Sequence, residues 1–413
     1  MSAIHQGAVA DCVCLVAAVM AIALGLPAYS KAKWGRDPAA DPGGCRGRDR
    51  TAEHEAFRLP QPTSSGGCPS RDITSQVTST HFGGEHRGSH GAAGNRFLVN
   101  WSATYDSRME LSEESLTDDT LEEVVAFFRR SNPFAQKALG WDTGRFMDFR
   151  WANNAVSAAD DPGWFGRYCR IFRDGGEIRA VAVAEDGGDA EFIITPGEDR
   201  VAVNEVLSRL IEIHRERGAG LVFEVSDAEQ WLRDIFVAAG LTEGEITGHE
   251  WEYDLASLPA PAPVAEGFTV ATLDGVVDRA AVYAGISDCF GKAFGREGDG
   301  VPALLSVEQN PMFRPELSVF ALSPEGTVVA YCRGTVDSDN GVCGVDPVCT
   351  HPDFQRLGLG KAVVQRCFAN QRALDGRFSY IGSLPEPAPG TFLYRSLGPK
   401  SRTVSSAWTY HFA

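Results

Sequence analysis

A short stretch near the carboxyl terminus combines glycines and basic side chains in a way that suits an anion. Residues 355–361 contain Gly358 and Gly360 between Arg356 and Lys361, after an apolar strand pattern and before a helical one. Glycine lets a ligand approach the backbone closely, and the first-turn amides of a helix have no partner within the helix. The helix dipole adds about half a positive charge at that end. The spacing therefore predicts a binding site for a phosphorylated ligand.

The charge of the whole chain indicates that this cationic site is local. The 413 residues carry a formal net charge of -17 at pH 7, which argues against a general nucleic-acid binder, because neutralising phosphates needs a basic face. The ten cysteines lack the paired spacing of a zinc site, so we expect reduced thiols and no bound metal. An acidic chain is compatible with a cationic acceptor but does not identify one.

A second motif downstream adds to this interpretation. Residues 355–360 read Q-R-L-G-L-G, and residues 393–398 read L-Y-R-S-L-G. In this order they resemble motif A and the L-Y-x-x-x-G segment of the GNAT superfamily of acyl-CoA-dependent N-acetyltransferases, within residues 266–413. The resemblance implies that the loop amides bind the pyrophosphate of acetyl-CoA and that the preceding strand bonds its pantetheine arm. The residues it assigns to acetyl-CoA are Val348, Cys349, Thr350, Gln355, Arg356, Leu357, Gly358, Leu359, Gly360 and Lys361.

Acetyl transfer to an amine needs a proton acceptor and a proton donor. At pH 7 an amine with a pKa near 10.4 is neutral in about four molecules per ten thousand, and the thiolate must be protonated as it leaves. The resemblance assigns the acid to Tyr394, on a short helix whose first turn we expect at Pro389; the alternative is a core aromatic. Asp346 is the candidate base, on a strand where similar proteins often have Glu. Asp346 must be buried for this role, and the alternative is a residue that sets the turn before Pro347.

From residue 97 onward the chain divides into two halves whose predicted elements follow the same order. A Pro- and Ala-rich linker, residues 258–265, separates residues 97–257 from residues 266–413. The expected fold class is mixed α/β, with two tandem GNAT-like domains, each a twisted mixed sheet flanked by helices. Acetyl-CoA is expected in the second domain, where the strands near Thr350 and Gly382 move apart.

The first half lacks the residues that the second half offers to acetyl-CoA. Glu198 and Asp199 stand where the second half has its glycine loop, and Phe236 stands where it has Tyr394. Carboxylates repel a pyrophosphate, and a phenyl ring has no proton to donate. We therefore expect a degenerate domain that does not bind CoA, packs on the second half and shapes the acceptor channel.

Two further expectations concern the first half and the leader. Thr120 and Glu123 are predicted to form a capping box before an apolar helix face. Residues 1–96 are rich in Gly, Ser, Pro and His, so we expect a disordered leader or a spurious extension. Their apolar run, residues 12–26, falls short of the roughly 20 residues that span a bilayer. It has the length of a signal peptide, but the Lys or Arg expected before such a segment is missing, so the signal is weak. Three histidines of the leader could imitate a metal cluster: His81, His86 and His90. We assign them no metal role.

The sequence thus predicts a cytoplasmic N-acetyltransferase that transfers an acetyl group from acetyl-CoA to a primary amine of a small molecule or peptide. The alternative, from another functional class, is a non-catalytic acyl-CoA-binding sensor or scaffold. Neither nucleic acid nor stable membrane insertion is expected. The acceptor, the acyl length and the oligomeric state stay open, with a homodimer as one option.

Overall fold

One mixed sheet of twelve strands organises the part of the chain that the computed structural model describes: residues 111–131, 141–152, 163–185, 190–258, 261 and 263–412. The predicted leader, with its apolar run and its three histidines, lies outside these residues. None of the helices within these ranges is both long enough and apolar enough to cross a membrane.

The predicted order of helices and strands is confirmed in both halves. The first half contains β1 (Ser112–Ser115), η2 (Asp118–Thr120), α2 (Leu121–Ser131), α3 (Thr143–Ala152), α5 (Trp164–Tyr168), β2 (Cys169–Asp174), β3 (Glu177–Glu185), β4 (Ala190–Ile194), α6 (Arg200–Arg217), β5 (Leu221–Ser226), α7 (Gln230–Ala239) and β6 (Thr242–Asp254). The second half contains β7 (Thr269–Thr272), η4 (Leu273–Gly275), α8 (Arg279–Phe294), α9 (Gly300–Val307), η5 (Pro315–Leu317), β8 (Ser318–Leu322), β9 (Val328–Asp337), β10 (Val342–Thr350), η6 (Pro352–Phe354), α10 (Leu359–Ala373), β11 (Phe378–Ser383), α11 (Pro389–Ser396) and β12 (Ser401–Tyr410). The elements that were not predicted are the helices α3, α5 and α9 and the strands β1, β6, β7 and β12.

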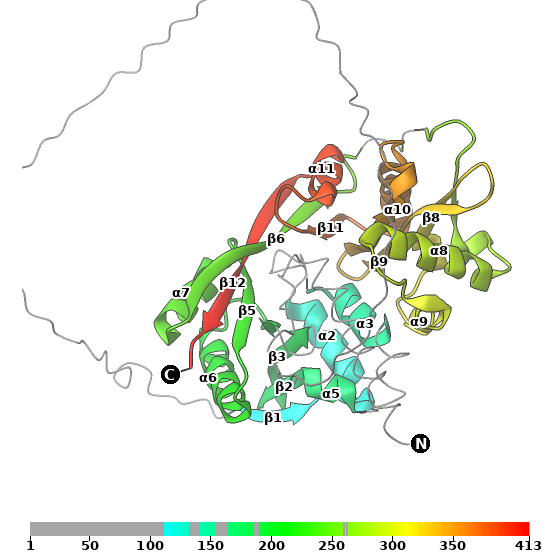
Figure 1. Cartoon of the computed structure of the whole chain (residues 1–413). Coiled ribbons are helices and arrows are strands. Elements are labelled where there is room, and N and C mark those ends of the chain that lie inside the picture. Colours follow the sequence, from blue (N-terminus) through cyan, green and yellow to red (C-terminus); the bar gives the residue numbers. More distant parts are fainter. Residues whose placement is uncertain are drawn as a thin grey trace, which may run out of the picture. The chain divides into compact units, whose positions relative to one another are not determined.

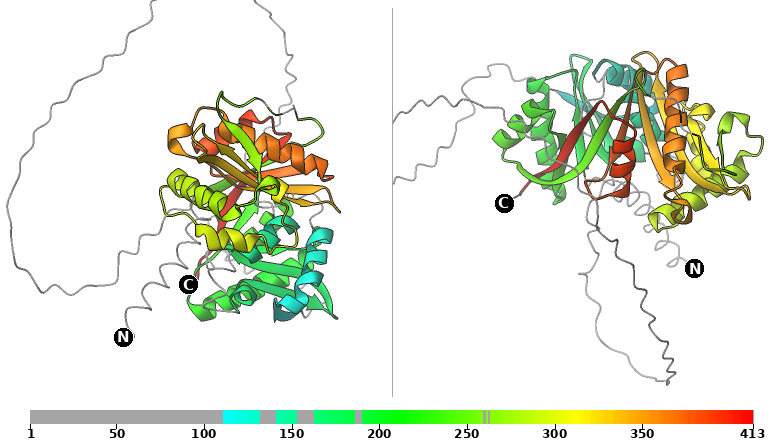
Figure 2. Two further views of the ribbon diagram at one scale, coloured as in Figure 1. Left: turned by 90° about the vertical axis from the view of Figure 1, so that its right-hand side faces the viewer. Right: turned by 90° about the horizontal axis from the view of Figure 1, so that it is seen from above.

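The two halves exchange their last strands. Along the sheet the order is β1-β2-β3-β4-β5-β12-β6-β11-β10-β9-β8-β7. Strand β12 of the second half therefore lies between β5 and β6 of the first, and β6 lies between β12 and β11, with antiparallel pairing at each contact. Figure 1 shows the red β12 among the green strands, and Figure 2 shows the same arrangement from two other sides. The domain boundary at the linker stays a prediction, because the sheet is continuous across it.

Helices cover both faces of the sheet, because neighbouring residues of each strand point to opposite sides. In the first half, α6 and α7 cover one face with Leu207 and Phe236, and α2 and α3 cover the other with Phe128 and Phe146. In the second half, α10 and α11 cover one face and α8 and α9 the other. The predicted apolar face of α2 is confirmed, with Phe127 buried in addition.

The predicted capping box at the start of α2 is wrong. Glu123 pairs instead with Arg173 on β2, through two contacts of 2.7 Å between its carboxylate oxygens and the guanidinium. The amide of Thr117 donates to the hydroxyl of Thr120 at 3.0 Å, so the chain is capped one turn earlier. A charge-assisted bond to Arg173 is stronger than a bond to a neutral amide, which explains the difference.

Helix α3 belongs to the first half but packs on the second. A Cβ atom added at Gly144 would lie 2.7 Å from Cβ of Thr335 on β9, so only glycine permits this close approach. Asp148 pairs with Arg333 of β9 at 3.1 Å, and Ser306 of α9 donates its hydroxyl to the carbonyl of Trp151 at 3.0 Å. The prediction that the first half packs on the second is confirmed, and α3 carries much of this contact.

A buried carboxylate on β5 leads to a prediction about stability. Glu224 is 3% exposed, and burial, helped by the charge of Glu185, raises its pKa to about 8. In the unfolded chain this group ionises near its ordinary value, so folding becomes less favourable as pH rises from about 4.5 to about 8. We expect Glu224→Gln to stabilise the protein at pH 8 by on the order of 2–4 kcal/mol and to change little at pH 4. Denaturant unfolding at both pH values checks this, and equal differences at the two values would contradict it.

Candidate functional site

The site begins where two parallel strands stop pairing. Strands β10 and β11 pair only from Val342 to Gly344 on one side and from Phe378 to Tyr380 on the other. Strand β10 stays paired with β9 as far as Thr350, with a bulge between Val345 and Val348, while β11 stays paired with β6. We call the unpaired stretch, residues 345–350 facing residues 381–383, the β10/β11 opening. Backbone groups along its two edges have no partner on the facing strand.

The predicted glycine loop lies next to this opening and is exposed. Gln355, Arg356, Leu357 and Gly358 are exposed, whereas the following Leu359 and Gly360 are buried at the start of α10. Gly358 has φ 78° and ends the loop, a conformation that favours glycine. The first intrahelical bond runs from the amide of Ala362 to the carbonyl of Gly358, 3.0 Å. The preceding amides of the first turn have no intrahelical acceptor and can bind an anion.

The predicted strand residues lead from the opening to the loop. Val348 is half-buried against the α10 side, and Cys349 is buried with its sulfur 3.8 Å from that of Cys289. A Cβ atom at Gly360 would lie 2.8 Å from Oγ1 of Thr350, so glycine lets the strand end and the helix start meet. Burial of Cys349 beside a second thiol agrees with a structural thiol rather than a nucleophile.

One basic residue of the loop has another partner. The ammonium of Lys361 donates to the carbonyl of Ser396 at 2.8 Å, which fixes its charge at the end of α11. Arg356 is exposed and has φ 67°, so its backbone takes the left-handed form. Of the two basic residues expected at the anion site, Arg356 is the exposed one.

Tyr394 is buried on α11 beside the opening. Its residue is 7% exposed, and the predicted place of Pro389 in the first turn of this helix is confirmed. Burial raises the pKa of Tyr394, and the nearby charge of Asp346 raises it further, so the phenol keeps its proton at neutral pH. The hydroxyl of Tyr253 on β6 donates to the carbonyl of Tyr394 at 2.8 Å. A strand of the first half thus holds the helix that carries Tyr394.

Asp346 lies on the β10 edge of the opening, as predicted, but it is exposed. The predicted role of Asp346 as base required a buried carboxylate, and this requirement is not met. The site therefore brings together the glycine loop, the strand residues 348–350 and Tyr394, with an exposed carboxylate at its edge.

The comparisons with known proteins agree with this geometry. The model of the acetyltransferase (GNAT) family matches residues 280–398, which include β10, the loop, α10 and α11. This segment belongs to the GNAT family. No curated protein sequence matches the chain.

The GNAT likeness extends to the first half at the level of fold. A tandem GNAT protein from the clavulanic acid biosynthesis pathway matches with a TM-score of 0.50 at 14% identity, over 73% of this chain and 98% of that one. A GCN5-related N-acetyltransferase from Sphaerobacter thermophilus matches with a TM-score of 0.46 at 17% identity, over 72% of this chain and 95% of that one. The first of these shows a tandem GNAT fold for both halves.

In the first half, the position equivalent to the anion site is filled. Asp199 caps α6, accepts a bond from the amide of Ala202 at 3.1 Å and pairs with Arg179. Its carboxylate thus takes a helix-start amide that a pyrophosphate would need. Phe236, at the position of Tyr394, is 1% exposed in the core. These contacts agree with the expectation that the first half does not bind CoA.

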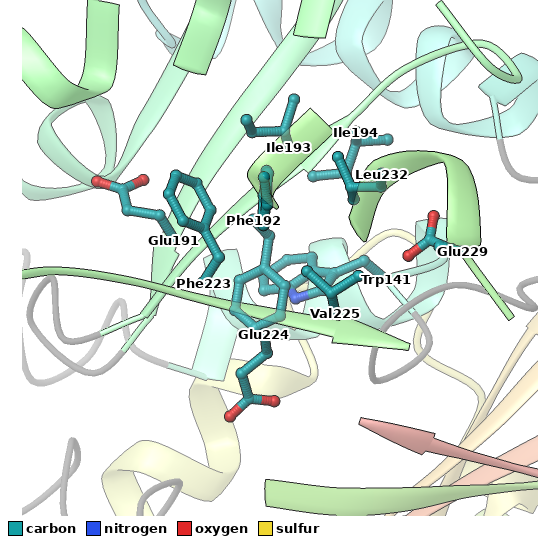
Figure 3. Close-up of a pocket in the computed structure, with 11 residues that line it drawn as sticks. Trp141, Glu191, Phe192, Ile193, Ile194, Phe223, Glu224, Val225, Glu229 and Leu232 are labelled. Carbon is teal, nitrogen blue, oxygen red and sulfur yellow. The ribbon is translucent and has the colours of Figure 1, made fainter. Parts of the chain in front are cut away.

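The equivalent opening of the first half is filled by aromatic rings. Strands β4 and β5 pair at one position, Glu191 with Phe223, and the cavity beside them measures about 20 Å³, room for about one water molecule. Figure 3 shows its lining, in which Trp141 and Phe192 have ring centroids 5.5 Å apart. Phe223 packs on Phe236 with centroids 4.8 Å apart. An acyl chain has no space there.

Proposed function

We propose that the chain is an N-acetyltransferase that transfers the acetyl group of acetyl-CoA to a primary amine by direct attack. The observation that carries this proposal is the β10/β11 opening, which lies between an exposed helix-start loop and a buried, protonated Tyr394. The anion site matches the diphosphate of acetyl-CoA, the unpaired backbone groups of β10 match its pantetheine arm, and the acid matches its thioester.

The chain's residues would divide the work as follows. The first-turn amides of α10 hold the pyrophosphate, and the backbone groups of Val348 and Thr350, which face away from β9, bond the pantetheine arm. A backbone amide of this strand polarises the thioester carbonyl. The amine nitrogen forms a bond to the carbonyl carbon, the carbon–sulfur bond breaks, and Tyr394 gives its proton to the departing sulfur.

The experiment that tests this function uses the full chain and two measurements. Calorimetry with acetyl-CoA should show binding, and a thiol-reactive dye should report CoA release that depends on an added primary amine from a panel. Binding without amine-dependent release would favour the sensor or scaffold alternative. No heat with acetyl-CoA would contradict both functions.

A further inference from the structure

A glutamate of the first half reaches the β10/β11 opening. Glu250 on β6 is paired in register with Gly382 on β11, and a Cβ atom at Gly382 would lie 3.9 Å from its Oε2 atom. Gly382 is two residues beyond Tyr380, the last residue of β11 that pairs with β10. Because β6 is exchanged between the halves, the carboxylate of Glu250 lies beside the β11 edge of the opening, within electrostatic range of Asp346.

The carboxylate of Glu250 is buried and incompletely bonded. The residue is 6% exposed, and its Oε2 atom has no hydrogen-bond partner among the described residues. Two positions along the same strand, Glu252 accepts bonds from Lys400 at 2.6 Å and from Ser401 at 2.7 Å. A buried carboxylate oxygen without a partner is costly in free energy. Both carboxylate oxygens of Glu224 also lack a partner among the described residues, so Glu250 is distinguished by its place beside the opening, where a ligand can supply the bond.

We propose that Glu250, and not Asp346, accepts the proton of the acceptor ammonium at the β10/β11 opening. The proposal rests on the acetyl transfer proposed above. Over the whole reaction the ammonium gives up two protons. One passes to Glu250 and on to solvent. The other replaces, on Tyr394, the proton that the phenol gives to the sulfur.

The surroundings of Glu250 suit a base at neutral pH. Burial raises its pKa to about 8; Arg145 on α3 lowers it, whereas the charges of Asp142 and Asp346 raise it. A base with a pKa near the working pH combines a usable fraction of carboxylate with a strong tendency to take a proton. The titratable groups around it are Asp142 just before α3, Arg145 on α3, Asp346 on β10, Tyr380 on β11 and Tyr253 on β6 itself.

The same surroundings favour an acceptor that arrives as a cation. Arg145 is already committed, because its guanidinium donates to both carboxylate oxygens of Glu185 at 2.7 and 2.8 Å. Asp142 is also buried, and burial raises its pKa to about 6. A cationic nitrogen entering here would meet carboxylates from both halves, which stabilises its charge until Glu250 removes the proton.

The test compares three variants of the full chain with the amine that reacts fastest in the panel. Glu250→Gln should lower kcat/KM at least about a hundredfold, whereas Asp346→Asn should lower it less than about tenfold. Glu224→Gln is the matched control, because it removes another buried carboxylate with a pKa of about 8 from a strand of the first half; its rate should stay within about threefold of wild type. A larger loss for Asp346→Asn than for Glu250→Gln would overturn the proposal.

Hydroxylamine separates proton removal from a structural effect. Its nitrogen is unprotonated at neutral pH, so Glu250→Gln should acetylate it at close to the wild-type rate. An equal loss with hydroxylamine and with the amine would overturn the proposal while leaving acetyl transfer in place. Failure of the wild type to acetylate any nucleophile, despite binding acetyl-CoA, would overturn the proposed function and this inference with it.

Discussion

Replacing Tyr394 with phenylalanine should lower kcat by about a hundred- to ten-thousand-fold while the affinity for acetyl-CoA changes less than about threefold. The phenol is buried and keeps its proton, so its loss removes the donor for the departing sulfur. Phenylalanine keeps the ring, and the bond from Tyr253 is made to the backbone carbonyl of residue 394, so α11 should stay in place.

Amine-dependent CoA release and calorimetry with acetyl-CoA measure the two quantities for this variant. A parallel loss of affinity and turnover would indicate that Tyr394 acts in packing only. Unchanged turnover would remove it from the reaction.

Gly358→Asp should weaken acetyl-CoA binding by about a hundredfold or more. Gly358 caps α10 as Asp199 caps α6, and the carboxylate of Asp199 accepts a helix-start amide. An aspartate at 358 would compete for the amides that bind the pyrophosphate and would repel its charge. The variant introduces into the second half the N-cap aspartate that we expect to prevent acetyl-CoA binding in the first half.

Gly358→Asn is the matched control, because Asn and Asp tolerate the positive φ of this position similarly and only Asp brings a charge. We expect a loss of less than about tenfold for Gly358→Asn by calorimetry. Equal losses for the two variants would show that shape, and not charge, decides binding at this loop.

The motif residues were predictable because each depends on local structure. The loop ending at Gly358 and the helix carrying Tyr394 follow from spacing over a few residues, and the structure has both elements at the predicted positions. The expectation that the first half does not bind acetyl-CoA also rests on local features, Asp199 and Phe236. The specific roles of Tyr394 and of the glycine loop stay predictions, which the variants above test.

The proposed contribution of the first half to the site, through Glu250, was not predictable from local patterns. In the segment that carries Glu250, charged residues alternate with Trp251 and Tyr253, which reads as a strand with one solvent-facing side. Strand β12 covers one edge of β6 and β11 the other, and the side of the sheet that Glu250 faces is buried. Helix α3 was missed for a related reason: its apolar residues have no single face, because it is buried between the halves.

The exchange of β6 and β12 has a consequence for any shortened form of this protein. The side chain of Asp227, just after β5, accepts a bond from the amide of Val404 in β12, 177 residues away along the chain. A fragment with only one half would leave the backbone of β5 or of β11 without its neighbour. Such uncovered strand margins recruit other chains and cause aggregation. Gene truncations that keep the glycine loop intact should therefore yield insoluble material rather than a smaller working enzyme.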